Sequence, residues 1–380
     1  MTIRILKTLC LLILNCMIVV PTTTIMAQTR PIEAQLLVAT YSPDGSLIAI
    51  GGAFESFYGV KITNSLGEPV AQLTTEGLVT SVSWSPDGNR FAVRLEPFDE
   101  YGETIYIYNF AEGKFFDTPS VILKTAYPSE VSVMPWSPDG KFLLNHYGVF
   151  LTVWDTQSGE IVFDLVLGTT GRDAIEDLAW HPVTNEIYVL NDVNVLSVYD
   201  AKSGLQTREP MVLPFSEPLL VDAYPYASEF AFNSDGSELA IVFNDDYQTT
   251  RIIDPVSGKT LREFRPENPH SDIRSLRWVA EDKLLVTVGV GVEVGEVAAP
   301  FAVRFWDAET GELLHSYENL LGVYVRDFAV NPDATRMVVI GGFPESAGKP
   351  GSLPLTDDVG LTLETDSALL LYLEPIAITP

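Results

Sequence analysis

Histidine is the side chain best suited to acid–base chemistry at neutral pH and to binding transition metals. The chain has four histidines, and they are far apart in the sequence: His146, His181, His270 and His315. A zinc site needs three or four ligands that converge on one point. No HExxH, GxxxxGKS/T or GxSxG motif is present. We therefore expect no metal site and no catalytic residues of these classes.

Paired carboxylates are a second possible source of chemistry, because hard oxygen ligands bind calcium. The adjacent pairs are Asp99-Glu100, Asp245-Asp246 and Asp357-Asp358. None of them has the spaced acidic and glycine positions of a calcium-binding loop. A solvated acidic loop is the simpler interpretation, so we expect neither a metal nor any other cofactor.

Aromatic side chains in long connections are the remaining candidates, and the chemistry that they offer is binding. The connections span residues 96–103, 210–228, 291–300 and 343–367. Aromatics rimmed by acidic groups are typical of protein-binding surfaces, although loop aromatics also pack onto their own scaffold. The candidate binding residues are Phe98, Tyr101, Phe215, Tyr224, Tyr226, Phe343, Asp357 and Asp358.

An internal repeat indicates the elements that must position these loops. A turn of the Ser-Pro-Asp-Gly type, preceded by an aromatic or aliphatic residue, occurs seven times at intervals of 43 to 52 residues. Pro presets the backbone at the second position of such a turn, Asp suits the third, and Gly accepts a positive φ. Alternating apolar residues on both sides predict a β-hairpin. The copies begin at Tyr41, Trp84, Trp136, Trp180, Phe232, Trp278 and Val330.

A second hairpin follows each first one. It is clearest in FLTVWDTQSGEIVFDL from Phe150 and in FAVRFWDAETGELLHSYE from Phe301. Two hairpins in each of seven units make about 28 strands. A four-stranded sheet of this size cannot bury both faces alone, so the units must pack face to face around an axis. The tryptophans before the turns then fill the spaces between adjacent sheets.

With these motifs the chain resembles the WD40 family of β-propellers, over about residues 35 to 375. The resemblance is carried by Trp154-Asp155 and Trp306-Asp307, each followed by a turn with Gly-Glu, and by the Ser-Pro-Asp-Gly turns. It implies an all-β, seven-bladed β-propeller of four-stranded antiparallel blades that holds partner proteins or peptides. No Gly-His dipeptide precedes any blade. We therefore interpret the chain as a divergent, bacterial-type exported member.

The two ends of the chain raise separate questions. Residues 1–27 have the order of parts of a secretory signal peptide, with an apolar run of 12 residues that is too short to cross a bilayer. An uncleaved anchor is the alternative. We expect residues 28–380 to form one propeller, with the segment from Gln28 to Gln35 as the outer strand of the last blade and the C-terminal IAITP as the alternative. The blades are expected to start near residues 36, 79, 131, 175, 227, 273 and 325.

The charge of the chain limits its partners. It has 51 acidic and 23 basic residues and a formal net charge of −28 at pH 7. Such a surface repels phosphate backbones and anionic lipids, so we expect no nucleic-acid partner and no polybasic attachment to a membrane. Because the apolar run of the leader is too short to cross a bilayer, we also expect no membrane span after signal cleavage. Both cysteines, Cys10 and Cys16, lie in the leader, so the mature chain can form no disulfide.

The sequence as a whole predicts an exported, periplasmic or extracellular propeller that binds a protein or peptide through the face with the long connections. A non-enzymatic role is the preferred interpretation, and two others stay open. One is a propeller enzyme of the lactonase or quinone-dependent dehydrogenase type. The other is a carbohydrate-binding component of the cell envelope. The sequence does not indicate the oligomeric state.

Overall fold

The structure is a computed structural model of the chain. Its backbone contacts divide the chain into two units, Met1–Pro31 and Ile32–Pro380, and all the described residues belong to the second. The described residues are 35–97, 103–115, 118–125, 134–168, 174–213, 226–244, 248–267, 272–290, 293–294, 297–298, 302–318, 324–342, 359–363 and 368–373.

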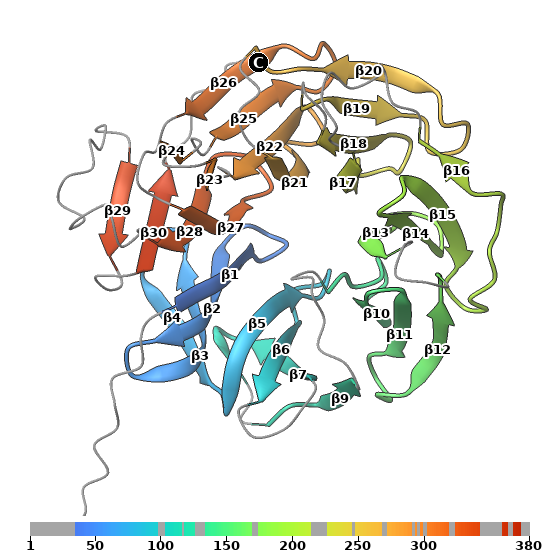
Figure 1. The fold of residues 1–380 in the computed structure, drawn as a ribbon. Coiled ribbons are helices and arrows are strands. Elements are labelled where there is room, and N and C mark those ends of the chain that lie inside the picture. Colours follow the sequence, from blue (N-terminus) through green and yellow to red (C-terminus); the bar gives the residue numbers. More distant parts are fainter. Residues whose placement is uncertain are drawn as a thin grey trace, which may run out of the picture. The chain divides into compact units, whose positions relative to one another are not determined.

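Every regular element among these residues is a β-strand, and the sheets are arranged around a central axis (Figure 1). All strand pairings within the sheets are antiparallel, and in most sheets successive strands run from the axis outward. The inner strand of the first sheet contacts the inner strands of both the second and the last sheet. The second unit is therefore a β-propeller with antiparallel blades.

The first four sheets follow the chain from Gln35 to Val212. The first contains β1 (Gln35–Tyr41), β2 (Leu47–Phe54), β3 (Phe57–Asn64) and β4 (Pro69–Thr74). The second contains β5 (Gly77–Trp84), β6 (Arg90–Pro97), β7 (Glu103–Ala111), β8 (Lys114–Phe115) and β9 (Val121–Thr125). The third contains β10 (Phe142–Tyr147), β11 (Phe150–Asp155) and β12 (Ile161–Val166). The fourth contains β13 (Ile175–Trp180), β14 (Glu186–Asn191), β15 (Val195–Asp200) and β16 (Met211–Val212).

The remaining sheets use residues from Tyr226 onward. The fifth contains β17 (Tyr226–Phe232), β18 (Leu239–Asn244), β19 (Thr250–Ile253) and β20 (Thr260–Phe264). The sixth contains β21 (Asp272–Val279), β22 (Leu284–Val290), β25 (Ala302–Asp307) and β26 (Leu313–Glu318), and a small hairpin of β23 (Glu293–Val294) and β24 (Val297–Ala298) lies between β22 and β25 in the sequence. The last contains β27 (Tyr324–Val330), β28 (Met337–Gly342), β29 (Val359–Leu363) and β30 (Ala368–Leu373).

The number of complete blades differs from the sequence prediction. Among the described residues six sheets have four or more strands, and the third sheet has three. In the third unit the expected inner strand is reduced to an isolated bridge between Trp136 and Leu143, and residues 131–133 lie outside the described residues. Pro135 has no backbone N–H to donate to a ladder. The prediction of seven four-stranded blades is therefore corrected to six.

The outer strand of the last sheet also differs from the prediction. The order of the described strands is β27-β28-β30-β29, so Val359–Leu363 is the outermost described strand of this sheet, and residues 28–34 lie outside the described residues. Gln35 instead begins the inner strand of the first sheet. Because β29 and β30 are joined by only residues 364–367, their pairing closes a short loop at a small entropic cost. The alternative IAITP segment lies outside the described residues.

The Ser-Pro-Asp-Gly turns have the predicted chemistry. In the first, the Gly45 N–H donates to the Ser42 carbonyl at 2.8 Å, and Gly45 has a φ of 71°. The Ser42 hydroxyl donates to the Asp44 carboxylate at 2.6 Å and accepts the Leu47 N–H at 3.0 Å. The turns that begin at Ser85 and Ser137 repeat these bonds. Each turn thereby fixes the register of a first hairpin.

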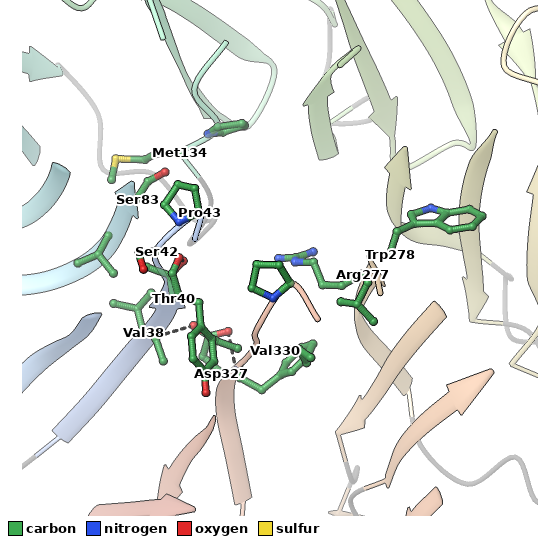
Figure 2. Close-up of a pocket in the computed structure, with 18 residues that line it drawn as sticks. Val38, Thr40, Ser42, Pro43, Ser83, Met134, Arg277, Trp278, Asp327 and Val330 are labelled. Carbon is green, nitrogen blue, oxygen red and sulfur yellow. Dashed lines mark hydrogen bonds between the residues drawn. The ribbon is translucent and has the colours of Figure 1, made fainter. Parts of the chain in front are cut away.

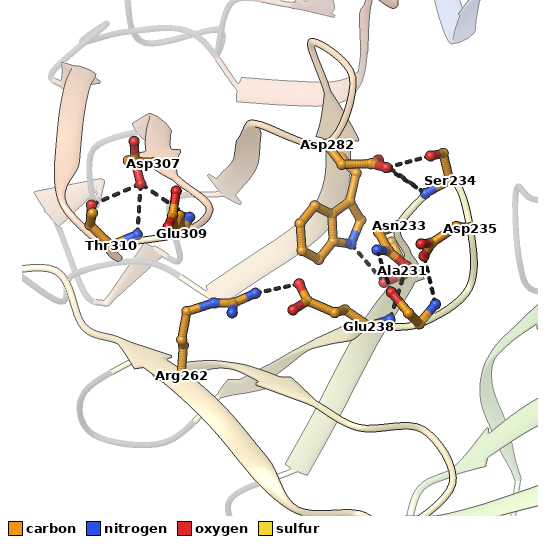
Figure 3. Close-up of polar contacts among 12 residues, drawn as sticks. Ala231, Asn233, Ser234, Asp235, Glu238, Arg262, Asp282, Asp307, Glu309 and Thr310 are labelled. Atoms are coloured by element: carbon orange, nitrogen blue, oxygen red, sulfur yellow. Dashed lines mark hydrogen bonds and ion pairs between the residues drawn. The ribbon is translucent and has the colours of Figure 1, made fainter. Parts of the chain in front are cut away.

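The aspartates of the second hairpins hold their turns in a different way. The Asp307 Oδ1 atom accepts the Thr310 N–H at 2.6 Å and the Thr310 hydroxyl at 2.8 Å (Figure 3). The next residue, Gly311, has a φ of 75° and donates its N–H to the Asp307 carbonyl. The same bonds recur at Asp155, Asp200 and Asp254. These carboxylates are structural staples of tight turns.

Adjacent sheets are joined by apolar packing and by indole hydrogen bonds. Five of the six tryptophans are buried, as predicted for residues that fill the spaces between sheets. In three of the six, two of them buried and Trp278 half-buried, the indole N–H also donates to a carbonyl of the preceding unit. These bonds are Trp136 to Ser83 at 3.3 Å, Trp180 to Pro135 at 3.0 Å and Trp278 to Ala231 at 2.9 Å.

The sixth turn departs from the repeat, and its backbone is strained. Ala280, Glu281 and Asp282 have consecutive positive φ values of 53°, 57° and 65°. Each such residue costs about 1–2 kcal/mol relative to a right-handed conformation. The Ala280 N–H donates to the Pro332 carbonyl of the last unit, and the Asp282 carboxylate accepts the Ser234 N–H of the fifth (Figure 3). Contacts to both neighbouring sheets therefore hold this turn in place.

Candidate functional site

Two cavities lie among the inner strands, and we call them together the axial site. The larger has a volume of about 430 Å³ and is lined by β1, β5, β21, β27 and the segment at Met134. The smaller has a volume of about 310 Å³ and is lined mainly by β13 and β17. Arg277 and Pro135 line both. Both cavities extend from the middle of the inner strands to the prolines of the hairpin turns, so they occupy the turn half of the axis.

Arg277 is the cation of the axial site. It lies on β21 next to Trp278, and its side chain points into the larger cavity while the indole is turned away (Figure 2). Successive side chains of a strand point to opposite sides, which explains the difference. Its Nη1 atom donates to the Leu276 carbonyl at 2.7 Å, and the side chain is exposed.

Two aspartates on other inner strands face Arg277, and they are bound in the same way. The Asp327 carboxylate accepts its neighbour's N–H, from Phe328, at 2.8 Å and the Ala39 N–H of the first sheet at 2.9 Å. Asp177 has the equivalent pair of bonds: its carboxylate accepts the Leu178 N–H at 2.7 Å and the Phe230 N–H of the fifth sheet at 2.8 Å. In both cases a β-bulge just before the aspartate turns it toward the following sheet.

Burial changes the acidity of these two groups. The pKa of Asp327 is raised from 3.8 to about 6 because burial disfavours the charged form, while the backbone N–H donors and Arg277 oppose the rise. The residue as a whole is half-buried, but its carboxyl group is enclosed by protein. Burial also raises the pKa of Asp177, and Arg277 opposes part of this rise. Arg277 is thus a shared counter-charge for two carboxyl groups on opposite inner strands.

The sequence analysis did not select these three residues. Each is a charged residue within an inner strand whose other positions are mostly apolar or small, and Asp177 and Asp327 stand three positions before the residue that precedes their turns. A charged residue at such a position in the repeat is a usable signal. It was missed because the search for sites was directed at the connections between strands.

One of the eight predicted binding residues is described. Tyr226 is the first residue of β17, pairs with Asn244 and is half-buried. It lies at the end of the strand farthest from the turn, and it does not line either cavity. The others lie outside the described residues: Phe98, Tyr101, Phe215, Tyr224, Phe343, Asp357 and Asp358.

The described histidines are separated in the structure as well as in the sequence. His146 is buried on β10, and burial, with a smaller effect of Arg94, lowers its pKa to about 4. His181 lies in a turn and His315 on β26, both half-buried, and His270 is outside the described residues. Within the described part of the chain no three His, Cys, Asp or Glu side chains form a cluster suited to a metal ion.

The buried Arg94 belongs to a polar cluster at the loop end of the second and third sheets. Its Nε atom lies 3.5 Å from the Glu103 carboxylate, and its Nη1 atom donates to the Asn145 side chain at 3.4 Å. Arg94 lies on β6 and Glu103 begins β7, so the pair links the two strands that the connection 98–102 joins. The described part of the chain contains no helix that is long and apolar enough to cross a bilayer.

Comparison with known families gives one match. The model described as "WD domain, G-beta repeat" matches residues 67–93. This segment begins in the turn before β4 and ends within β6, so it joins the outer strand of the first sheet to the first hairpin of the second. The sequence unit is therefore offset from the sheet that it helps to build. No curated protein matches the chain.

Proposed function

Because this chain is a WD40-like β-propeller, we propose that it is an exported, non-enzymatic scaffold that binds a protein or peptide partner. The partner contacts the face on which the long connections lie. Propellers of this kind are typical scaffolds for protein interactions, and binding residues tend to lie on loops held by a rigid framework.

One observation carries the proposal: a framework that is tied together from sheet to sheet supports connections that are much longer than its turns. Indole N–H groups and aspartate carboxylates join neighbouring sheets through hydrogen bonds. Between β6 and β7, and between β28 and β29, the connections run over residues 98–102 and 343–358. A rigid support lowers the entropic penalty of presenting such loops to a partner.

The charge of the chain indicates the chemistry of the partner. A net charge of −28 attracts a basic protein or peptide and repels nucleic acids. Export follows from the leader, with cleavage near Ala27 and a periplasmic or extracellular location. N-terminal sequencing of the protein recovered outside the cytoplasm tests this part; a retained leader would support the alternative of an anchor.

Affinity capture with the exported protein tests the binding proposal. One variant replaces residues 343–358 by a short Gly-Ser linker and leaves β29 intact, because Val359–Leu363 is the outer strand of the last sheet. We expect wild type to capture a specific partner and the shortened variant to lose it at an unchanged melting temperature. The matched control is Val183→Ser, which alters an exposed turn residue at the other end of the strands. An unaltered set of captured proteins in the shortened variant would remove this connection from the site.

A further inference from the structure

Among the described residues, the axial site has hydrogen-bond donors to spare at Arg277. Within the described part of the chain, the Arg277 guanidinium makes one hydrogen bond, to the Leu276 carbonyl, and no carboxylate lies within ion-pair distance of it. An arginine side chain has five N–H donors in a planar fork. Most of these donors therefore face the larger cavity without a protein acceptor among the described residues.

The two aspartates beside Arg277 do not offer a comparable site for a cation. Both oxygens of Asp327 already accept backbone N–H groups, and the same holds for Asp177. These bonds connect neighbouring sheets, so a cation at the remaining lone pairs would lie beside the N–H groups that hold the junctions. The polar capacity left in the cavity thus favours a negatively charged ligand group.

The lining of the larger cavity indicates what carries that charged group. The lining also includes apolar residues, among them Val38, Val82, Met134 and Val330. A cavity of about 430 Å³ lies in the range of sites that hold small molecules or single peptide residues. A ligand that fits has an anionic head next to an apolar side chain, which is the chemistry of a peptide C-terminus with an apolar last residue.

A carboxylate could come from an acidic side chain of a peptide or from the C-terminus of a basic peptide. The net charge of the protein favours the second source. An acidic segment would be repelled by the net charge of −28, whereas a basic segment would be attracted. A basic peptide can still present one carboxylate at its terminus. Arginine recognises a carboxylate through two parallel N–H bonds, so the planar fork suits this group.

We propose that the larger axial cavity binds the free C-terminal carboxylate of a basic peptide, with Arg277 as its hydrogen-bond donor and the surrounding apolar side chains around its last residue. The inference rests on the proposed function in one respect, that the ligand is a peptide. It adds a contact region at the turn half of the axis, which is distinct from the long connections.

The test uses pooled hexapeptides with lysine at the first two positions and Leu, Ile, Val or Phe at the last. One pool has free C-terminal carboxylates, a second has the same sequences as amides, and a third has amidated peptides with Glu last. Each pool is passed over immobilised mature protein, and the retained peptides are quantified. We expect the free acids to be retained at least tenfold more strongly than either amidated pool.

Variants assign the effect to the guanidinium. Arg277→Gln is expected to abolish the preference for free acids, and Arg277→Lys to retain a reduced preference, because an ammonium keeps the charge but not the fork. The matched control is Arg265→Gln, which removes the same charge from a residue paired with Glu263 on the outside of the fifth sheet and leaves the preference intact. Arg277 is exposed and, among the described residues, donates one hydrogen bond, so its replacement should leave the fold intact while it raises the pKa of Asp177 and Asp327 further.

Three results would overturn the inference: no retention of any pool, equal retention of amides and free acids, or a preference that survives in Arg277→Gln. Strong retention of the Glu pool would overturn the assignment to a chain terminus. Failure here is separate from failure of the proposed function. If the captured cellular partner depends on residues 343–358 while the peptide pools show no preference, the scaffold role stands and the axial inference falls.

Discussion

The aspartates of the outer turns and those of the axis use the same bonds with opposite consequences. Asp307 and Asp327 each accept two backbone N–H groups. The pKa of Asp307 is lowered, first by the Thr310 backbone N–H and then by the Thr310 hydroxyl. The pKa of Asp327 is raised to about 6, because burial outweighs its two N–H donors. Hydrogen bonding alone therefore does not decide the charge of a carboxyl group; its access to water does.

The two sets also differ in what they hold together. Each turn aspartate fixes a few residues of its own hairpin, as Asp307 does with Thr310. Each axial aspartate joins two sheets: Asp177 links the fourth to the fifth, and Asp327 links the last to the first. The bond between Asp327 and the Ala39 N–H is one of those that close the ring, because it joins the last sheet to the first. The axial pair should thus have the larger effect on stability.

The largest expected effect comes from removal of an axial carboxyl group. Asp327→Ala leaves the Ala39 and Phe328 N–H groups without their acceptor, and unsatisfied buried groups cost about 1–3 kcal/mol each. We expect a loss of about 2–4 kcal/mol in the free energy of unfolding, measured by urea denaturation at pH 5. Asp177→Ala should behave alike. A loss smaller than that caused by Asp307→Ala would contradict the comparison.

A second test follows the pH dependence, whose sign differs between the two sets. For Asp327 the folded pKa of about 6 exceeds the ordinary 3.8. Between these values the folded protein binds more protons than the unfolded chain, so the free energy of unfolding falls as pH rises. The total change is at most about 3 kcal/mol. Asp327→Asn should lack it.

For Asp307 the direction is reversed. Its folded pKa lies below 3.8, so its contribution is fully present above that pH and is lost as the pH falls through the folded pKa. Denaturation curves from pH 3 to 7 for wild type, Asp327→Asn and Asp307→Asn separate the two trends. If the free energy of unfolding depended on pH in the same way in Asp327→Asn and Asp307→Asn, burial would not give the two carboxyl groups opposite pKa shifts.

The smallest expected effect comes from a turn staple. In Asp307→Ala, water replaces much of what the carboxylate accepted, because the Glu309 and Thr310 N–H groups lie at an exposed turn. We expect a loss of about 0.5–1 kcal/mol in the same urea experiment at pH 5, in the range of other local side-chain caps. A loss as large as that of Asp327→Ala would show that the turns matter to the framework as much as the axis does.

Local patterns in the sequence predicted much of the fold but not all of it. The turns at Ser42, Ser85 and Ser137 and those after Asp155 and Asp307 formed as expected, since their bonds lie within a few residues. Two predictions were wrong. The third unit has three described strands, and the outer strand of the last sheet is Val359–Leu363. In the last sheet a local hairpin of β29 and β30 takes the position that we had expected a distant segment to fill, and no local pattern records which of two competing segments pairs.

The loop residues selected from the sequence stay a prediction, because seven of the eight lie outside the described residues. Of the eight loop residues selected, Tyr226 is described, and it lies apart from both cavities. Arg277, Asp177 and Asp327 were overlooked, although each is a charged residue in an apolar strand. Their association depends on three inner strands that are separated by tens of residues in the sequence and meet only around the axis.

The sequence by itself determined the repeat, the hairpins, their turn chemistry and the acidic character of the chain, because these depend on neighbouring residues and on composition. The tertiary structure decided which strands lie at the edges of the sheets, and which neighbouring sheets are joined by a hydrogen bond from a tryptophan indole or to an aspartate carboxylate. It also decided that one arginine faces two enclosed carboxyl groups. Burial is a property of the assembled ring, so the charge states that it imposes could emerge only once the inner strands had come together.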